Sequence, residues 1–422
     1  MSSAFLNNTL LPAPDAFNEE RPLIMHIDLN SCFATVEQQA RPLLRGKPVA
    51  IVNRRTDKTA IVTASYEAKA KGVKVGMKLG EARQLCPDII PLESDPPKYR
   101  YVYHKLLDIM RDYSAHVTMK SIDEGVIDFH QTSHDIAGRD LVEIGMEIKR
   151  RLKEEIGEWM RCNIGISTNR FLAKTAAGLH KPDGLDVITS QNIRQVLGEL
   201  KLTDLTGIAD RNERRLNSVG IFTPLQFLDA DPVTLRKIVF KSVVGEWWYK
   251  RLRGFEVDDV ETQLGRVGRQ YVLERFDLTR EEIVQRLHHL CESVGSRMRG
   301  QKRAARGVYV YAKTYDRQYW HSSTLSPLPF FSDQSIYMQA LQLFDRAPDN
   351  IREIGVHCYE LTTADSSQLS FFADEIIRER QVVEAIDEIN KRFGDRTIHS
   401  GGTLNTGIYV KTKIPFGSTR YL

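Results

Sequence analysis

The chain has 422 residues, 27% of them charged and 41% hydrophobic, and carries a formal net charge of +4. This length predicts several domains, and the composition is typical of an ordinary globular protein. No apolar stretch approaches the roughly 18 residues that a membrane-spanning helix needs, so we expect no membrane contact. The five scattered cysteines form no CxxC motif, which argues against a zinc site or disulfide framework and favours a reducing cytoplasm.

The first part of the chain, residues 1–21, lacks the basic start and long apolar stretch of a secretory signal, and we expect a flexible extension. The apolar run 23–27 then predicts a buried strand that leads directly into Asp28. A helix over 33–44 and strands over 49–52 and 60–64 are predicted next, followed by helices from 66 to Gly72 and over 76–86. A helix over 98–114 and a hairpin over 115–129 come after them. The last two predicted elements are a helix over 138–156 and a strand over 161–166. This alternation predicts an α+β domain.

The predicted secondary structure changes twice in the second half of the chain. From about 188 to 257 the pattern is all helical with short loops, and strand-like runs return from about 262. These runs are 266–276, 307–315 and 355–361, separated by helices over 279–299 and 333–346 and followed by a loop and a charged helix over 373–393. The fold class predicted for the whole chain is therefore α+β and multidomain.

Two short acidic segments, HIDLN at 26–30 and SIDEG at 121–125, each end an apolar, β-branched run. Carboxylates at the end of a buried strand are costly unless a cation offsets their desolvation, and Asp28, Asp123 and Glu124 could hold two Mg²⁺ ions for displacement at phosphorus. Neighbours on a strand point to opposite faces, so Asp123 and Glu124 converge only if the backbone turns or bulges, which Gly125 would permit. A pair of solvated strand-end acids explains the spacing equally well.

The segment 205–221 has the spacing of a helix–turn–helix, with Gly207 in the turn. Such a turn can offer backbone N–H groups to a phosphate, although a plain helical hairpin is the simpler interpretation of this segment alone. Ala209 stands where DNA-binding hairpins usually carry a second glycine.

The segment RMRGQKRAAR at 297–306 holds five basic side chains and no acid. Since the net charge of the chain is modest, nucleic-acid binding has to come from such local clusters, and we expect a positive loop on a phosphate backbone. The residues expected to contact DNA here are Arg297, Arg299, Lys302, Arg303 and Arg306. Lys69 and Lys181 each lie near a turn, where either could pair with a triphosphate or be a surface lysine.

Five segments occur in an order and spacing that resembles the Y-family, or translesion, DNA polymerases: HIDLNSCFATVE, TASYEAKAKGVKVGM, SIDEGVIDF, GISTNRFLAKTAAGLHKPDG and the turn at 205–221. The resemblance covers about 22–368 and includes the bacterial polymerase IV and polymerase V branches. It implies a right-hand architecture: a palm over 22–32 and 97–187, fingers over 33–96, a thumb over 188–257, a little finger over 262–366 and a C-terminal tail over 367–422.

The resemblance also implies residue roles. Asp28, Asp123 and Glu124 would bind two Mg²⁺ ions, which Mn²⁺ could replace, with help from the backbone carbonyl of Leu29. Phe33 would be the aromatic that excludes a 2′-hydroxyl. The remaining residues expected to bind the incoming nucleotide are Thr63, Tyr66, Lys69 and Lys181.

Three positions depart from the family pattern. Asn30 stands where the family usually has a second acid. A residue at this position is not expected to bind metal directly. Lys69 replaces the commoner arginine and so loses a bidentate phosphate contact. Cys32 replaces an aromatic beside Phe33, which would change the shape of the pocket over the nascent base pair.

The segment QLSFF at 368–372 resembles the bacterial sliding-clamp-binding peptide, with Gln368, Leu369, Phe371 and Phe372 as the docking residues. Packing on its own domain is the alternative for this segment. The function implied is template-directed, low-fidelity DNA synthesis past damaged bases without proofreading, by a cytoplasmic, nucleoid-associated monomer that binds primer–template DNA, dNTP and a sliding clamp. A noncatalytic scaffold and a nucleotide cyclase are the competing hypotheses.

Overall fold

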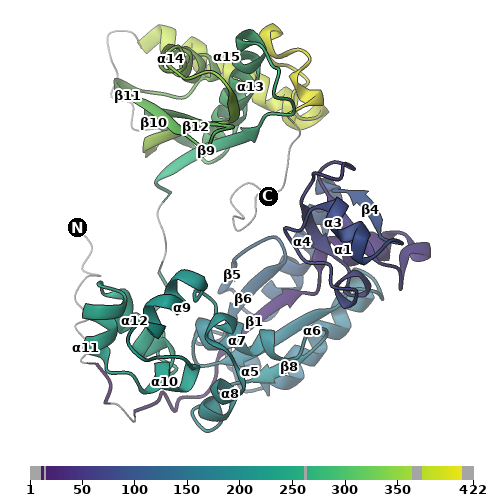
Figure 1. Ribbon diagram of the computed structural model, residues 1–422, viewed down its shortest axis with the longest axis vertical. Helices are drawn as coiled ribbons and strands as arrows, with labels where there is room; N and C mark the ends of the chain where they lie inside the picture. Colours follow the sequence, from purple (N-terminus) through teal and green to yellow (C-terminus); the bar gives the residue numbers. More distant parts are fainter. Residues whose placement is uncertain (1–10, 14–15, 261–263, 364–372, 411–422) are drawn as a thin grey trace. The chain divides into compact units, whose positions relative to one another are not determined.

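A computed structural model describes residues 11–13, 16–260, 264–363 and 373–410 of the chain (Figure 1). The described residues form two compact units, the first ending at Val260 and the second beginning at residue 264. No helix in these ranges is long and apolar enough to cross a lipid bilayer.

The first unit is built around a five-stranded sheet with the order β5-β6-β1-β7-β8. Its strands are β1 (Ile24–Leu29), β5 (Val117–Met119), β6 (Glu124–Asp128), β7 (Cys162–Ser167) and β8 (Leu185–Val187). The central strand β1 is antiparallel to both neighbours, and five of its six residues are buried. The predicted strand at 23–27, the hairpin at 115–129 and the strand at 161–166 are confirmed.

Helices cover this sheet and begin where a side chain can cap them. α4 (Pro96–Arg111), α6 (Leu141–Glu155) and α7 (Arg170–Leu179) start after Asp95, Asp140 and Asn169, whose side chains accept backbone N–H groups. Apolar residues of α4 and α6 share one core cluster with the sheet. α7 packs beside β1 and β7 (Figure 1), which brings its side chains to the centre of the unit. A short helix, α5 (His134–Ala137), precedes α6.

A three-stranded sheet with the order β3-β2-β4 forms a second layer of this unit. It contains β2 (Val49–Val52), β3 (Ile61–Ala64) and β4 (Ile90–Glu93), together with the helices α1 (Cys32–Ala40), η1 (Pro42–Leu44), α2 (Tyr66–Ala70) and α3 (Leu79–Leu85). Only β4 was not predicted, because its sequence Ile-Pro-Leu-Glu is short and contains a proline, a residue that normally argues against a strand.

The last part of the first unit is helical, as predicted for 188–257. Its elements are α8 (Ile193–Glu199), η2 (Leu202–Asp204), α9 (Asp210–Asn217), α10 (Pro224–Asp229), α11 (Pro232–Thr234), η3 (Leu235–Val239) and α12 (Val244–Arg251). Trp248 lies at the centre of their core and meets the ring of Phe171 from α7 edge-on at 5.2 Å.

The prediction of a flexible N-terminal extension has to be corrected for its described part. Phe17 packs against the helical core, and the Asn18 backbone N–H donates to the Arg253 carbonyl at 2.8 Å. The Tyr249 hydroxyl donates to the Pro12 carbonyl at 3.1 Å. These contacts were invisible in the sequence because the partners lie more than 230 positions apart.

The second unit contains a four-stranded antiparallel sheet with the order β11-β10-β12-β9. The strands are β9 (Arg266–Val272), β10 (Arg303–Thr314), β11 (Tyr319–Phe330) and β12 (Ile351–Thr363), and α13 (Arg280–Gly300) and α14 (Asp333–Phe344) pack against them. β11 was missed, since it is polar and carries Pro327 and Pro329. An edge strand tolerates proline because one side of its backbone needs no partner.

The C-terminal elements pack on the second unit through polar contacts. They are α15 (Ala373–Phe393), η5 (Gly401–Thr403) and η6 (Thr406–Ile408). Asp387 of α15 accepts two hydrogen bonds from Arg299, at 2.7 and 2.9 Å, and His289 of α13 lies 2.7 Å from the Thr406 hydroxyl. The predicted clamp-binding residues 368–372 lie outside the described residues.

Candidate active site

The strand register brings the three predicted acids to one edge of the central sheet. Asp28 lies directly opposite Glu124 in the β1–β6 ladder, and the Leu29 N–H donates to the Asp123 carbonyl at 2.8 Å. Asp123 and Glu124 therefore stand where β6 begins, whereas the sequence suggested that they end a strand. Asp123 belongs to the turn before β6 and Glu124 to the ladder itself.

Of the turn or bulge expected between Asp123 and Glu124, the structure has the turn, since the register then runs without a shift from Asp28 and Glu124 to Ile24 and Asp128. Gly125 itself lies in the ladder, opposite Ile27. Gly125 has a different function. A Cβ atom at this position would lie 2.6 Å from the Met119 sulfur and 2.9 Å from the Met110 methyl group. The glycine thus permits close packing beneath the acids.

Each acid of the ladder faces a lysine. Lys174 of α7 donates to both carboxylate oxygens of Glu124, at 2.8 and 3.0 Å, and His26 lies 3.4 Å from the same carboxylate. Burial raises the pKa of Glu124, but His26 and Lys174 outweigh it and lower the pKa to about 2. The ammonium group of Lys181 pairs with Asp28. Each of the two carboxylates thus has a lysine ammonium group as its partner.

Asp123 has a different environment. Its carboxylate accepts a hydrogen bond from the Ser121 hydroxyl and has no lysine partner among the ion pairs of the described residues. Burial raises the pKa of Asp123, and the charges of Asp28 and Glu124 raise it further, against the opposing effect of Ser121. The three acids are therefore close enough to repel one another, which is the arrangement that a divalent cation relieves.

The carboxylates of Asp28, Asp123 and Glu124 are chemically suited to bind divalent cations. In the described part of the chain, no three side chains of His, Cys, Asp or Glu converge on a single point where a cation could sit. However, carboxylate oxygens are the ligands that Mg²⁺ and Mn²⁺ prefer, and the ammonium groups of Lys174 and Lys181 already occupy cation positions beside Glu124 and Asp28.

Three of the predicted nucleotide-binding residues, Tyr66, Lys69 and Lys181, lie near Asp28. The Lys69 ammonium group donates to the Ser31 hydroxyl at 2.7 Å and lies 4.8 Å from the centre of the Tyr66 ring. Burial lowers the pKa of Lys69, and the neighbouring Lys181 lowers it further, while Asp28 opposes both. The two lysines are therefore close together, and an anionic ligand would stabilise both charges.

Ring stacking holds Phe33 in place. It lies at the start of α1 and stacks on Tyr99 with a centroid distance of 4.2 Å and an interplanar angle of 5°. Cys32 beside it is buried; burial raises the pKa of its thiol, and Asp123 and Asp28 raise it further. Thr63 lies on β3, opposite Ile51 of β2.

Sequence reasoning missed four polar residues of this site: His26, Ser31, Ser121 and Lys174. Lys174 gave the clearest signal, a single charge within the apolar helical segment FLAKTAAGL. No sequence signal marked Ser31. In the structure its backbone is left-handed with φ +45°, a conformation that non-glycine residues rarely adopt.

The predicted DNA-binding residues lie in two places. Gly207 precedes α9, has φ +98° and approaches Trp248, so a side chain would be strained there. Arg297 and Arg299 end α13, and Arg303 and Arg306 belong to β10, so the predicted loop is a helix, a two-residue turn and a strand. Their DNA contacts remain predictions. Arg299 is nearly buried and pairs with Asp333 and Asp387.

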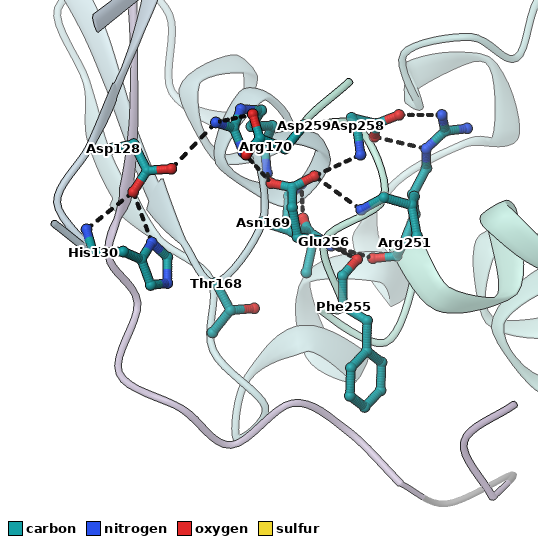
Figure 2. A network of polar contacts seen from close by, with 12 residues as sticks. Asp128, His130, Thr168, Asn169, Arg170, Arg251, Phe255, Glu256, Asp258 and Asp259 are labelled. Atoms are coloured by element: carbon teal, nitrogen blue, oxygen red, sulfur yellow. Dashed lines mark hydrogen bonds and ion pairs between the residues drawn. The ribbon is translucent and has the colours of Figure 1, made fainter. Parts of the chain in front are cut away.

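A polar network fastens α7 to the end of the first unit (Figure 2). Arg170 reaches Asp128 at 3.2 Å, Glu256 at 2.9 Å and Asp259 at 2.7 Å. The Asn169 side-chain amide donates to the carbonyls of Arg251 and Phe255 at 2.9 and 3.0 Å. The helix that carries Lys174 is therefore fixed at its first turn.

Known proteins resemble this chain over most of its length. Residues 27–178 match the model of the impB/mucB/samB family, and 267–371 match its C-terminal domain. DNA polymerase IV of Pelotomaculum thermopropionicum is 32% identical over 388 residues, covering 89% of this chain and 94% of the relative. The chain belongs to the Y family of DNA polymerases.

Solved structures of Y-family polymerases share the fold. A chimera named Dbh-Dpo4(243-245)-Dbh aligns with a TM-score of 0.69 at 23% identity, covering 81% of this chain and 99% of that chain. An insertion ternary complex of Dbh DNA polymerase aligns with a TM-score of 0.57 at 25% identity, covering 80% and 98%. The expected multidomain right-hand polymerase fold is thereby confirmed.

Proposed function

We propose that this Y-family polymerase is a template-directed, low-fidelity enzyme that extends a primer past damaged bases and lacks proofreading. The observation that carries the proposal is the register of β1 and β6, which brings Asp28, Asp123 and Glu124 together beside Lys69 and Lys181. Acids that bind cations and lysines that bind phosphate are the groups that nucleotidyl transfer requires.

In the proposed reaction the primer 3′-hydroxyl attacks the α-phosphorus of a dNTP, and pyrophosphate leaves. Lys69 and Lys181 hold the triphosphate, where their charges offset the negative charge that develops during transfer. Thr63 and Tyr66 would contact the same nucleotide, and Phe33 would pack under its sugar.

We further propose that Asp28, Asp123 and Glu124, with the Leu29 carbonyl, hold two Mg²⁺ ions. When bound, such cations supply Lewis-acid assistance at the hydroxyl and neutralise the triphosphate. The second unit would bind the DNA duplex through its basic residues, and the segment 368–372 would bind a sliding clamp. We expect a cytoplasmic monomer that works at the nucleoid.

Primer extension with Mg²⁺ and all four dNTPs tests the proposal. We expect the native chain to extend a primed template and Asp123→Ala to lose about 1,000-fold in rate, since Asp123 would hold a cation that offsets the developing charge. Asp112→Ala is the matched control, because it removes an exposed acid that pairs with Arg151 at the surface.

Extension that survives the loss of Asp123 would contradict the proposed site. If neither protein extends the primer while both bind DNA, the noncatalytic scaffold becomes the better hypothesis. Product formed from ATP or GTP alone would favour a cyclase.

A further inference from the structure

Asn30 directly follows β1, and its side chain is nearly buried at 2% exposure. Its Oδ1 accepts the backbone N–H of Asp183 at 2.8 Å, and its Nδ2 donates to Oδ1 of Asn163 at 2.9 Å. Asn163 lies on β7, directly opposite Asp28, and is fully buried.

The Asn163 amide continues the chain of hydrogen bonds. Its Nδ2 donates to the His180 carbonyl at 3.1 Å. The orientation of both amides is determined by partners that cannot change roles. A backbone N–H at Asp183 only donates, and a backbone carbonyl at His180 only accepts. The bond between the two side chains therefore has one possible direction, from Asn30 to Asn163.

Both amides hold the same turn, residues 180–184. Lys149 holds it from the other side, with its ammonium group on the carbonyls of Asp183 and Gly184, the latter at 3.1 Å. A Cβ atom at Gly184 would come within 2.3 Å of the His180 carbonyl, so the turn is closely packed. Lys181 projects from this turn and reaches Asp28.

We propose that the Asn30–Asn163 amide pair positions Lys181 for the triphosphate of the incoming nucleotide. The inference rests on the proposed polymerase function and makes Asn30 and Asn163 positioning residues. Since Asn30 is anchored to β1 beside Asp28, the pair links the acid-bearing strand to the lysine-bearing turn. It thereby sets the distance between the cation-binding acids and the phosphate-binding lysine.

The pair explains why an amide stands at position 30. An aspartate there could still accept the Asp183 N–H, but it could not donate to Asn163. Its carboxylate would face the Asn163 carbonyl oxygen in a buried site, and turning the Asn163 amide would leave the His180 carbonyl without a donor. Residue 30 is thus matched to residue 163 of this chain.

Steady-state primer extension with Asn30→Asp tests the inference. We expect the KM for dNTP to rise about tenfold, the effect of losing one buried hydrogen bond, with a smaller change in kcat. In a Lys181→Ala background the same substitution should change the KM by less than about twofold, since both changes act through one side chain. Equilibrium binding of dNTP to a complex with a dideoxy-terminated primer should weaken in parallel.

Asn169→Asp is the matched control, because it also removes a buried amide that donates two hydrogen bonds in the same unit. It should lower the thermal unfolding temperature without the selective rise in the KM for dNTP. Equal KM values for Asn30→Asp and the native enzyme, or a full tenfold effect in the Lys181→Ala background, would overturn the inference. Absence of extension by the native chain would instead reject the proposed function.

Discussion

At the scale of single residues, the packing around Phe33 fixes the position of its ring. Phe33 is 4% exposed and lies flat against Tyr99, whose hydroxyl donates to Glu37 at 3.1 Å. Lys98 donates to the same carboxylate at 2.9 Å. The Phe33 ring therefore cannot move toward α4, and a ligand atom placed in the volume of the ring would clash with it.

We predict that Phe33→Ala raises the efficiency of ribonucleotide incorporation by about 100-fold, the discrimination that a pocket achieves against an added hydroxyl group. The physical reason is the removal of the clash between the ring and a 2′-oxygen. Single-nucleotide insertion with rGTP and dGTP opposite dC measures it, and the dGTP value of the same variant is the control. An unchanged ratio of the two efficiencies would reject Phe33 as the residue that selects the sugar.

At the scale of elements, α7 connects the active site to the end of the first unit. Its first turn carries Arg170, which is 9% exposed and meets three carboxylates from β6 and the segment after α12. Its second turn carries Lys174 at the Glu124 carboxylate. One helix thus joins the acid-bearing sheet to the helical part of the unit.

We predict that Arg170→Ala lowers the free energy of unfolding of the first unit by about 2 kcal/mol, because the partly buried carboxylates of Asp128 and Glu256 lose hydrogen bonds from a charged donor. Arg194→Ala is the matched control. Arg194 also pairs with an aspartate, Asp229, but both side chains are more than half exposed, so its loss should cost less than about 1 kcal/mol. Urea unfolding of the full chain measures both, and equal costs would contradict the structural role of the network.

At the scale of the whole molecule, the proposed catalytic residues lie in the first unit, and the four-stranded sheet with the C-terminal helices forms the second. Arg299 and Glu292 of α13 are engaged by Asp387 and Arg396 of the C-terminal elements. The C-terminal tail expected from the sequence is therefore, over residues 373–410, a packed part of the second unit.

We predict that replacing Gln368, Leu369, Phe371 and Phe372 with alanine lowers clamp-stimulated synthesis by about 100-fold at low enzyme concentration, because tethering raises the local concentration of the polymerase at the primer. Synthesis without the clamp should be unchanged, which controls for folding. Full stimulation of the variant would mean that this peptide does not bind the clamp.

The sequence alone determined the alternation of elements, the acids and the family resemblance, because these depend on local periodicity and on motifs of a few residues. It placed Asp28, Asp123 and Glu124 near one another. It missed β11, the packing of residues 16–18 and the lysine at Glu124, since each depends on contacts between residues distant in the chain.

Only the tertiary structure decided which cation faces which acid. The β1–β6 register opposes Asp28 to Glu124, and α7 then delivers Lys174 from 50 positions away. The same holds for Asn30, whose amide has hydrogen-bond partners at Asn163 and in the turn at 180–184, 133 and 153 positions downstream. Periodicity reports which face of an element is buried, whereas hydrogen-bond partners across a fold depend on how the elements are packed.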